Sequence, residues 1–360
     1  MARIHLDKIA HSYTPHPQEP EDWALRRMDH VWEDGGAYAL LGPSGCGKTT
    51  LLNVISGLLQ PREGHVRYDG EDVTGMPPQR RNIAQVFQFP VIYDTMTVAE
   101  NLAFPLKNRK VPRNRIEERV REVAGMLDLS GELNRRAKAL SADAKQKISL
   151  GRGLVRADVA AILFDEPLTV IDPQMKWHLR RKLKQVHEAT NSTMVYVTHD
   201  QNEALTFAEK VVVMVDGQVV QMGTPQELFE NPRHTFVGYF IGSPGMNLLP
   251  CAIEGREAVV DGGRVPLDPE LADRARGHNA TLELGIRPEF VTFDPDSRKG
   301  LPVLVDAVED LGNYRMLSLR LGSHRIKAKQ PEDAPPPGES GSVTLPPDWV
   351  RLYADRYMVA

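Results

Sequence analysis

A glycine-rich loop, set between an apolar run and a run with helical spacing, constrains the fold of this chain most. The loop consists of Gly42, Pro43, Ser44, Gly45, Cys46, Gly47, Lys48, Thr49 and Thr50. It matches G-x-x-x-x-G-K-[ST], follows a predicted buried strand at 37–41 and precedes a predicted helix at 51–58. Glycines let the backbone close around an anion, and the N–H groups at the helix start point at it. The sequence therefore predicts a phosphate-binding loop, in which the Lys48 ammonium adds charge and the Thr49 hydroxyl holds Mg²⁺.

Composition narrows the class of protein. The chain has 360 residues, of which 26% are charged and 41% hydrophobic, as in ordinary globular proteins, and its length allows two domains. A formal net charge of −4 gives no reason to expect nucleic acid as a partner. The two cysteines, Cys46 and Cys251, make no disulfide framework and suit a reducing cytosol. The sequence has no apolar run of membrane-spanning length and an N-terminus too polar for a secretory signal, so we expect a soluble or peripheral protein.

Strands and helices alternate over the first two thirds of the chain. Further strands are predicted at 65–68, 82–87, 160–164, 193–197 and 211–215, with a hairpin at 216–217 leading to 218–222. Helices are predicted within 97–129, from Ser141 onward, and after Asp172, which would be an N-cap followed by Pro173. This alternation predicts a doubly wound α/β sheet with ligands at the carboxyl ends of its strands.

The pattern of predicted secondary structure changes after about residue 240. Gly242, Pro244 and Gly245 mark a linker, and the segment 330–341, rich in proline, glycine and acids, predicts an exposed loop. Short apolar runs separated by turn residues follow the linker, at 258–260, 281–286, 301–305 and 316–321. They predict a small all-β domain.

The order of several motifs carries a resemblance to a known family. After the loop come Val86-Phe87-Gln88, Leu140-Ser141, 164–167 (Phe-Asp-Glu-Pro), Ile171-Asp172 and 198–200 (Thr-His-Asp). This set resembles the nucleotide-binding subunits of ABC transporters, and more narrowly the maltose-importer ATPase group. The segments 284–289 and 308–312 are similar to recurring segments of that group's C-terminal β domain. The resemblance covers essentially the whole chain.

That resemblance implies a domain organisation. It implies an α/β P-loop NTPase (ABC ATPase) domain at 1–240, with a helical lobe at about 89–156. An all-β regulatory domain of the OB-fold and TOBE type would follow at 241–360.

The acids after the predicted strand 160–164 have separate chemical roles. Asp165 ends that strand near the loop, where its carboxylate would hold Mg²⁺, or it would simply cap the strand end. Glu166 points elsewhere and is the candidate general base that polarises the attacking water, the alternative being a solvated acid.

Other roles come from the resemblance alone. It implies that His199 contacts the γ-phosphate, that Gln88 touches Mg²⁺ and the attacking water, and that Asp172 lies in the D-loop. It also implies that an aromatic residue stacks on adenine, for which Tyr13 is the first candidate and Trp23 the second.

The signature loop departs from the family pattern. Leu-Ser-Gly-Gly-Gln is replaced here by Leu140-Ser141-Ala142-Asp143-Ala144. In the family this loop caps the ATP of a second subunit. A carboxylate at ~5 Å from a phosphate charge, at an effective dielectric of ~20, costs about 3 kcal/mol. That exceeds the gain of under about 1 kcal/mol that an acid obtains from the helix dipole. We therefore expect Asp143 to impair this loop and the chain to pair with a second, non-identical ATPase. A homodimer that tolerates the aspartate is the alternative.

The function implied is an ATPase that energises an importer for a sugar, a polyol such as glycerol, or a related solute, including glycerol phosphate. The implied partners are two permease subunits, which dock on 89–105, and a solute-binding protein. The chain would act at the cytoplasmic face of the membrane with ATP and Mg²⁺ as cofactors. A DNA-repair ATPase is disfavoured because 51–140 has no cysteines and no room for heptads. A purely regulatory ATP-binding protein is disfavoured by the complete catalytic set.

Overall fold

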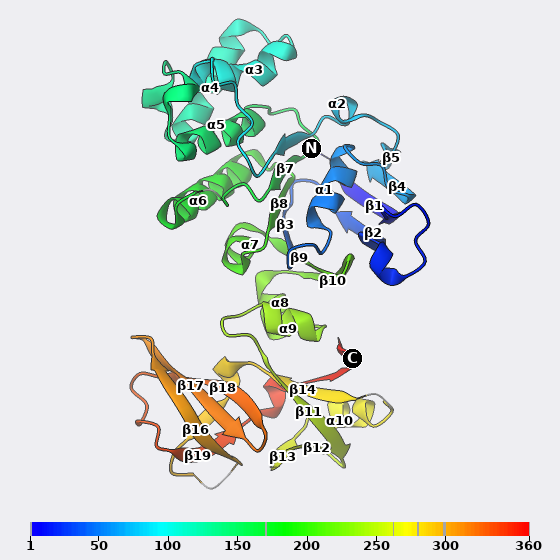
Figure 1. Cartoon of the computed structure of the whole chain (residues 1–360), viewed down its shortest axis with the longest axis vertical. Helices are drawn as coiled ribbons and strands as arrows, with labels where there is room; N and C mark the ends of the chain where they lie inside the picture. The colour runs from blue at the N-terminus through cyan, green and yellow to red at the C-terminus, as the bar shows by residue number, and fades with distance from the viewer. Residues whose placement is uncertain (1, 170, 262, 279–280, 298–299, 360) are drawn as a thin grey trace. The chain divides into compact units, whose positions relative to one another are not determined.

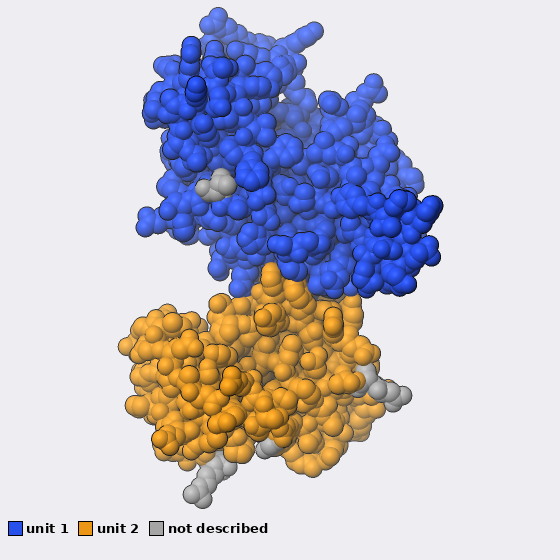
Figure 2. Space-filling view, in the orientation of Figure 1, with its two compact units in different colours: residues 1–225 blue, residues 226–360 orange. Residues whose placement is uncertain are grey.

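The computed structural model describes residues 2–169, 171–261, 263–278, 281–297 and 300–359. The chain divides into two compact units, residues 1–225 and 226–360, which Figure 2 colours separately. Residues 226–240 therefore group with the second unit, although the sequence placed them before the domain boundary. In the described part, no helix has both the length and the apolar character that crossing a membrane requires.

A six-stranded sheet organises the first unit (Figure 1). Its strand order is β10 (Gln218–Gly223), β9 (Lys210–Val215), β3 (Ala37–Leu41), β8 (Met194–Thr198), β7 (Ile162–Asp165) and β6 (Ala84–Val86). All neighbours pair in parallel except the β9–β10 hairpin, which confirms the predicted doubly wound sheet. Because Leu41 pairs with Thr198 and Asp165 with Val197, the carboxyl ends of β3, β7 and β8 meet at one edge.

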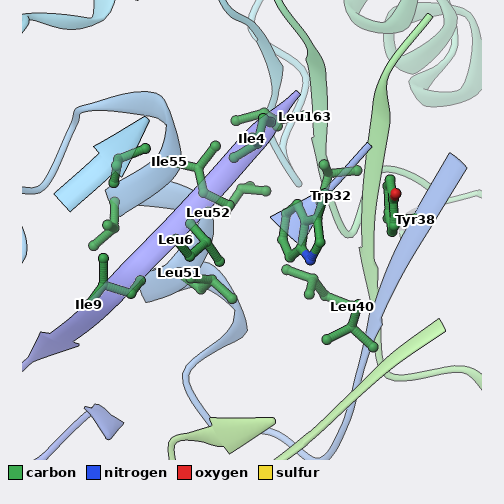
Figure 3. Packing of buried hydrophobic residues seen from close by; sticks show 14 of the residues in the cluster. Ile4, Leu6, Ile9, Trp32, Tyr38, Leu40, Leu51, Leu52, Ile55 and Leu163 are labelled. Atoms are coloured by element: carbon green, nitrogen blue, oxygen red, sulfur yellow. The ribbon is translucent and has the colours of Figure 1, made fainter. Parts of the chain in front are cut away.

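A second, antiparallel sheet contains β2 (Leu25–Trp32), β1 (Ile4–His11), β4 (Glu63–Tyr68) and β5 (Glu71–Asp72). Helix α1 (Lys48–Ser56) packs its apolar face into a cluster shared with both sheets. Figure 3 shows Leu51, Leu52 and Ile55 of α1 beside Leu6 of β1, with Leu40 of β3 in the same cluster. Each side chain is fully buried, which contributes about 1.5–3 kcal/mol per residue relative to an exposed position. This core fixes α1, and with it the loop before it.

Helices complete the first unit (Figure 1). The short α2 (Pro78–Arg81) precedes β6, and α3 (Val98–Asn108), α4 (Arg113–Met126) and α5 (Ala142–Leu154) form a lobe. Helix α6 (Pro173–Thr190) follows β7, and α7 (Gln201–Phe207) follows β8. Ser141 caps α5 and Asp172 caps α6, so both predicted helix starts are confirmed.

The second unit is mainly β structure. One sheet has the order β13 (Gly263–Pro266), β12 (Glu257–Val260), β11 (Asn247–Glu254), β14 (Leu282–Ile286), β20 (Arg351–Ala354) and β21 (Tyr357–Met358). The other has the order β15 (Thr292–Asp294), β19 (Ser340–Thr344), β16 (Leu301–Asp310), β17 (Tyr314–Leu321) and β18 (His324–Pro331). The helices are α8 (Pro225–Glu230), α9 (Thr235–Phe240) and α10 (Pro269–Ala275). The connection between β18 and β19 is mostly exposed, whereas Gln330, predicted at its start, is buried in β18.

Candidate functional site

The loop between β3 and α1 has the backbone of an anion cradle. Gly45 has φ +83° and Gly47, the residue before α1, has φ +99°, a region that residues with side chains rarely adopt. A Cβ on Gly47 would lie 2.4 Å from the Ala24 carbonyl oxygen, so a side chain does not fit there. No side chain caps the start of α1, and its first turn has no acid. The helix N–H groups and their positive dipole end thus face a potential phosphate.

The Lys48 ammonium lies within this loop. Its side chain is 5% exposed, and Nζ donates to the carbonyl oxygens of Gly42 and Pro43, at 2.8 Å each. Burial raises the pKa of the neighbouring Cys46 thiol, whose Sγ lies 3.8 Å from Nζ, so the thiol stays neutral at pH 7. The Cys46 thiol therefore adds no negative charge beside the Lys48 side chain.

Thr49 and Asp165 bring two oxygen ligands together. The Thr49 hydroxyl donates to Asp165 Oδ1 at 3.2 Å, which joins the first turn of α1 to the end of β7. Burial raises the pKa of the Asp165 carboxyl, and the charge of Glu166 raises it further, while the Thr49 hydrogen bond lowers it. A hydroxyl and a half-buried carboxylate form the oxygen-only donor set that Mg²⁺ prefers, so these residues fit a magnesium ion.

Glu166 and His199 meet at the same edge of the sheet. His199 Nδ1 lies 3.2 Å from Glu166 Oε2, and the Thr169 hydroxyl donates to the same oxygen at 3.3 Å. Glu166 has φ +44°, which is unusual for a residue with a side chain, and its N–H donates to the Val197 carbonyl at 3.0 Å. The carboxylate is thus oriented by several contacts, as a general base requires.

The two candidates for stacking on adenine, Tyr13 and Trp23, differ in their contacts with the glycine-rich loop. The Tyr13 hydroxyl lies 3.2 Å from Thr50 Oγ1, the residue is 66% exposed, and its ring makes a T-shaped contact with His11, with the ring centroids 4.8 Å apart. Trp23 is half-buried, and its carbonyl approaches Gly217. Tyr13 is therefore largely exposed and lies beside the loop.

Gln88 follows β6 closely, at the edge where the adjacent β7 ends in Asp165. The surrounding segment 87–93 presents exposed apolar side chains, namely Phe87, Phe89, Val91 and Tyr93. It is anchored to the helical lobe by residues that the sequence did not reveal. The buried Asn101 side chain exchanges hydrogen bonds with the Tyr93 backbone, and the Arg152 guanidinium lies 4.7 Å from the Tyr93 ring centroid.

The signature loop forms the start of α5. Ser141 Oγ accepts a hydrogen bond from the Ala144 N–H at 3.2 Å, and Ala142 is exposed. The Asp143 carboxylate points along the helix toward its C-terminal end, with Oδ2 3.3 Å from the Nζ of Lys147, whereas its Oδ1 is buried without a hydrogen-bond partner. The charge that the sequence led us to treat as unopposed is therefore balanced within the same helix. This i, i+4 spacing is visible in the sequence.

Asp172 lies at a separate helix start. Its carboxylate caps α6 by accepting a hydrogen bond from the Gln174 N–H at 3.0 Å. Gln146, which sequence reasoning missed, is fully buried, and its Nε2 donates to the Pro167 carbonyl at 2.7 Å.

Comparisons with protein families agree with this geometry. The ABC transporter model matches residues 25–169, the MalK OB fold domain model matches 242–291, and the TOBE domain model matches 284–352. The predicted fold class, an ABC ATPase domain followed by OB-fold and TOBE β structure, is confirmed. A solved structure, cbiO1 from Clostridium perfringens, described as part of the ABC transporter complex cbiONQ, shares the fold. Its TM-score is 0.57 at 24% identity, over 63% of this chain and 90% of that one.

Curated relatives extend the similarity over most of the chain. The sn-glycerol-3-phosphate import ATP-binding protein UgpC of Escherichia coli O157:H7 is 40% identical over 324 residues, 89% of this chain and 90% of its own length. UgpC of Escherichia coli K12 is 42% identical over 296 residues, 81% of this chain and 82% of its own length. The comparisons give no support to the non-identical second ATPase that we expected from Asp143, and they agree better with the alternative of a homodimer. The chain belongs to the ATP-binding subunits of ABC transporters, in the group that carries C-terminal OB and TOBE domains, and is an ATPase whose activity is coupled to import.

Proposed function

We propose that this chain hydrolyses ATP to energise the import of sn-glycerol 3-phosphate or a closely related phosphorylated polyol. The convergence of Lys48, the Thr49–Asp165 pair and the Glu166–His199 pair at one edge of the sheet carries the proposal for the chemistry. Support for the solute comes from the name of relatives that are 40–42% identical to the chain. A sugar importer is the second candidate, because the MalK OB fold model matches the second unit.

In this proposal, the loop and Lys48 bind the phosphates while Tyr13 stacks on the base. Thr49, Asp165 and Gln88 would hold Mg²⁺, which neutralises charge on the phosphate oxygens. Glu166 orients the attacking water and accepts its proton, and His199, 3.2 Å from that carboxylate, keeps it directed at the γ-phosphate. Catalysis then depends mainly on positioning and charge stabilisation.

A second copy of the same chain completes each site in this proposal. The exposed start of α5, with Ser141 and the Ala142 N–H, would receive the γ-phosphate held by the other copy. The ion pair between Asp143 and Lys147 supports this arrangement, because it offsets the acid at the receiving end.

The remaining partners are membrane proteins and a solute-binding protein. The exposed apolar side chains of 87–93 support docking of two permease subunits on the 89–105 region, since an exposed apolar cluster marks an interaction surface. The chain would then act as a peripheral subunit on the cytoplasmic face of the membrane. Nucleic acid is not among the proposed partners, given the net charge of −4.

Transport by the reconstituted assembly tests the proposal. The chain, its permeases and its solute-binding protein are placed in vesicles loaded with ATP, and uptake of radiolabelled glycerol 3-phosphate, glycerol and maltose is compared. We expect saturable, ATP-dependent uptake of glycerol 3-phosphate, which an excess of unlabelled maltose does not displace. Uptake of maltose alone would replace the proposed solute by the second candidate, and uptake that is independent of ATP would refute the function.

A further inference from the structure

Gln146 occupies a fully buried position, where an amide side chain is unfavourable unless its hydrogen bonds serve a specific function. It lies in the second turn of α5 and is 0% exposed. Its Nε2 donates to the Pro167 carbonyl at 2.7 Å, but its Oε1 is buried without a hydrogen-bond partner. Leucine would fill a similar volume without an unsatisfied oxygen, and an unsatisfied buried acceptor destabilises the fold. The single bond to Pro167 is therefore what the amide adds.

That bond fixes the peptide group between Pro167 and Leu168, one residue beyond Glu166. Glu166 has φ +44°, and such a conformation persists only where surrounding contacts hold it. On one side, the Glu166 N–H donates to the Val197 carbonyl at 3.0 Å. On the other side, the Glu166 carbonyl accepts from the Thr169 N–H and hydroxyl, at 3.3 and 3.1 Å. The next carbonyl, that of Pro167, accepts from Gln146, and Pro167 has no N–H with which to add a further bond. The direction of the Glu166 carboxylate follows from this backbone.

Gln146 itself lies in α5, the helix that begins at the signature loop and is called the signature helix below. Gln146 is one helical turn beyond Ala142 and Asp143, at the start of α5. We propose that Gln146 is a positioning residue that couples the signature helix to Glu166 of the same chain. A shift of α5 as the signature engages a nucleotide then reaches the general base through one hydrogen bond. This inference rests on the proposed role of Glu166.

Two substitutions in the reconstituted assembly test the coupling, with ATP turnover, the KM for ATP and the thermal unfolding midpoint as readouts. Gln146→Leu removes the donor and fills the space, and we expect kcat to fall roughly tenfold to a hundredfold, as for a misplaced catalytic group. The KM for ATP is expected to stay within about twofold, because no phosphate contact is lost. Ile148→Val, a change at another fully buried position of α5, is the matched control and should leave kcat near the wild-type value.

Gln146→Glu supplies a readout that a merely structural role would not move. An ionised carboxylate cannot donate to the Pro167 carbonyl, whereas a protonated one can. Burial and the facing carbonyl raise the pKa of such a carboxyl, so kcat of this variant, relative to wild type, is expected to rise as the pH falls from 8 to 6. This measurement decides the question even if Gln146→Leu fails to fold.

The inference is overturned if Gln146→Leu folds and keeps the wild-type kcat, or loses no more than Ile148→Val. It is also overturned if the pH profile of Gln146→Glu parallels that of wild type. Glu166→Gln in the same assembly separates the two proposals. A normal rate in Glu166→Gln would remove the role of Glu166 itself, whereas an inactive Glu166→Gln beside a normal Gln146→Leu would remove only the coupling.

Discussion

Lys147→Met should weaken ATP binding between two copies of the chain, because it removes the charge that balances Asp143. The Lys147 Nζ lies 3.3 Å from Asp143 Oδ2, and the lysine side chain is 9% exposed. Without the ammonium, the carboxylate would face the γ-phosphate of the other copy alone. At ~5 Å and an effective dielectric of ~20, each such like-charge pair costs about 3 kcal/mol. That corresponds to roughly a hundredfold weaker binding of ATP in the closed dimer.

A double-mutant cycle isolates this effect. The ATP concentration that gives half-maximal turnover is measured for wild type, Lys147→Met, Asp143→Asn and the double variant. Because Asn carries no charge, the double variant should recover most of the affinity, with a coupling free energy of about 2–3 kcal/mol. Lys145→Met is the matched control, since Lys145 pairs with Asp94 instead, at 3.3 Å. Lys147 does not balance Asp143 in this way if Lys147→Met binds ATP like wild type, or if the double variant binds ATP as weakly as Lys147→Met alone.

Three further predictions concern the nucleotide site. Gly47→Ala should lower the free energy of unfolding by about 2–4 kcal/mol in urea titrations, because its Cβ would meet the Ala24 carbonyl at 2.4 Å. Gly45→Ala, with open space around it and only left-handed strain, should cost about 1–2 kcal/mol. Burial raises the pKa of the Asp165 carboxyl, so the nucleotide-free protein should lose stability as the pH rises through that pKa. Asp165→Asn should flatten this pH dependence, measured by thermal unfolding. The same variant should lose Mg²⁺-dependent ATP binding. Tyr13→Ala should weaken ATP binding by about 1–3 kcal/mol in calorimetric titrations, and Tyr13→Phe should not, since stacking requires only the ring.

Local patterns predicted the elements of the first unit well. The run 37–41 forms β3 with the predicted bounds, because five apolar residues before a glycine-rich loop favour a short buried strand. Asp172 was predicted as a helix cap and Ser141 as a helix start, and the short oxygen side chain of each accepts a hydrogen bond from an N–H group of the next turn. The start of the second unit was harder to place, because residues 226–240 have helical patterns like those before them.

The contacts within the site depend on strand register and on packing between distant segments, which a single sequence reveals only in part. The approach of His199 to Glu166 requires the parallel register of β7 and β8, which no local pattern sets. The bond from Gln146 to Pro167 joins residues that lie far apart in the chain. The pairing of Asp143 with Lys147 follows from helical spacing, and it weakens the reason for expecting a non-identical partner, which the comparisons do not support.

We propose that Lys48 and its loop bind the triphosphate while Glu166 activates the attacking water. The most direct test compares Mg-ATP retention and turnover of wild type and Glu166→Gln in the complete transporter. We expect the variant to retain Mg-ATP as wild type does, whereas its turnover should fall by roughly 10²–10⁴-fold, the usual contribution of a general base. Wild-type turnover in Glu166→Gln, or a wild-type assembly that retains no Mg-ATP, would contradict it.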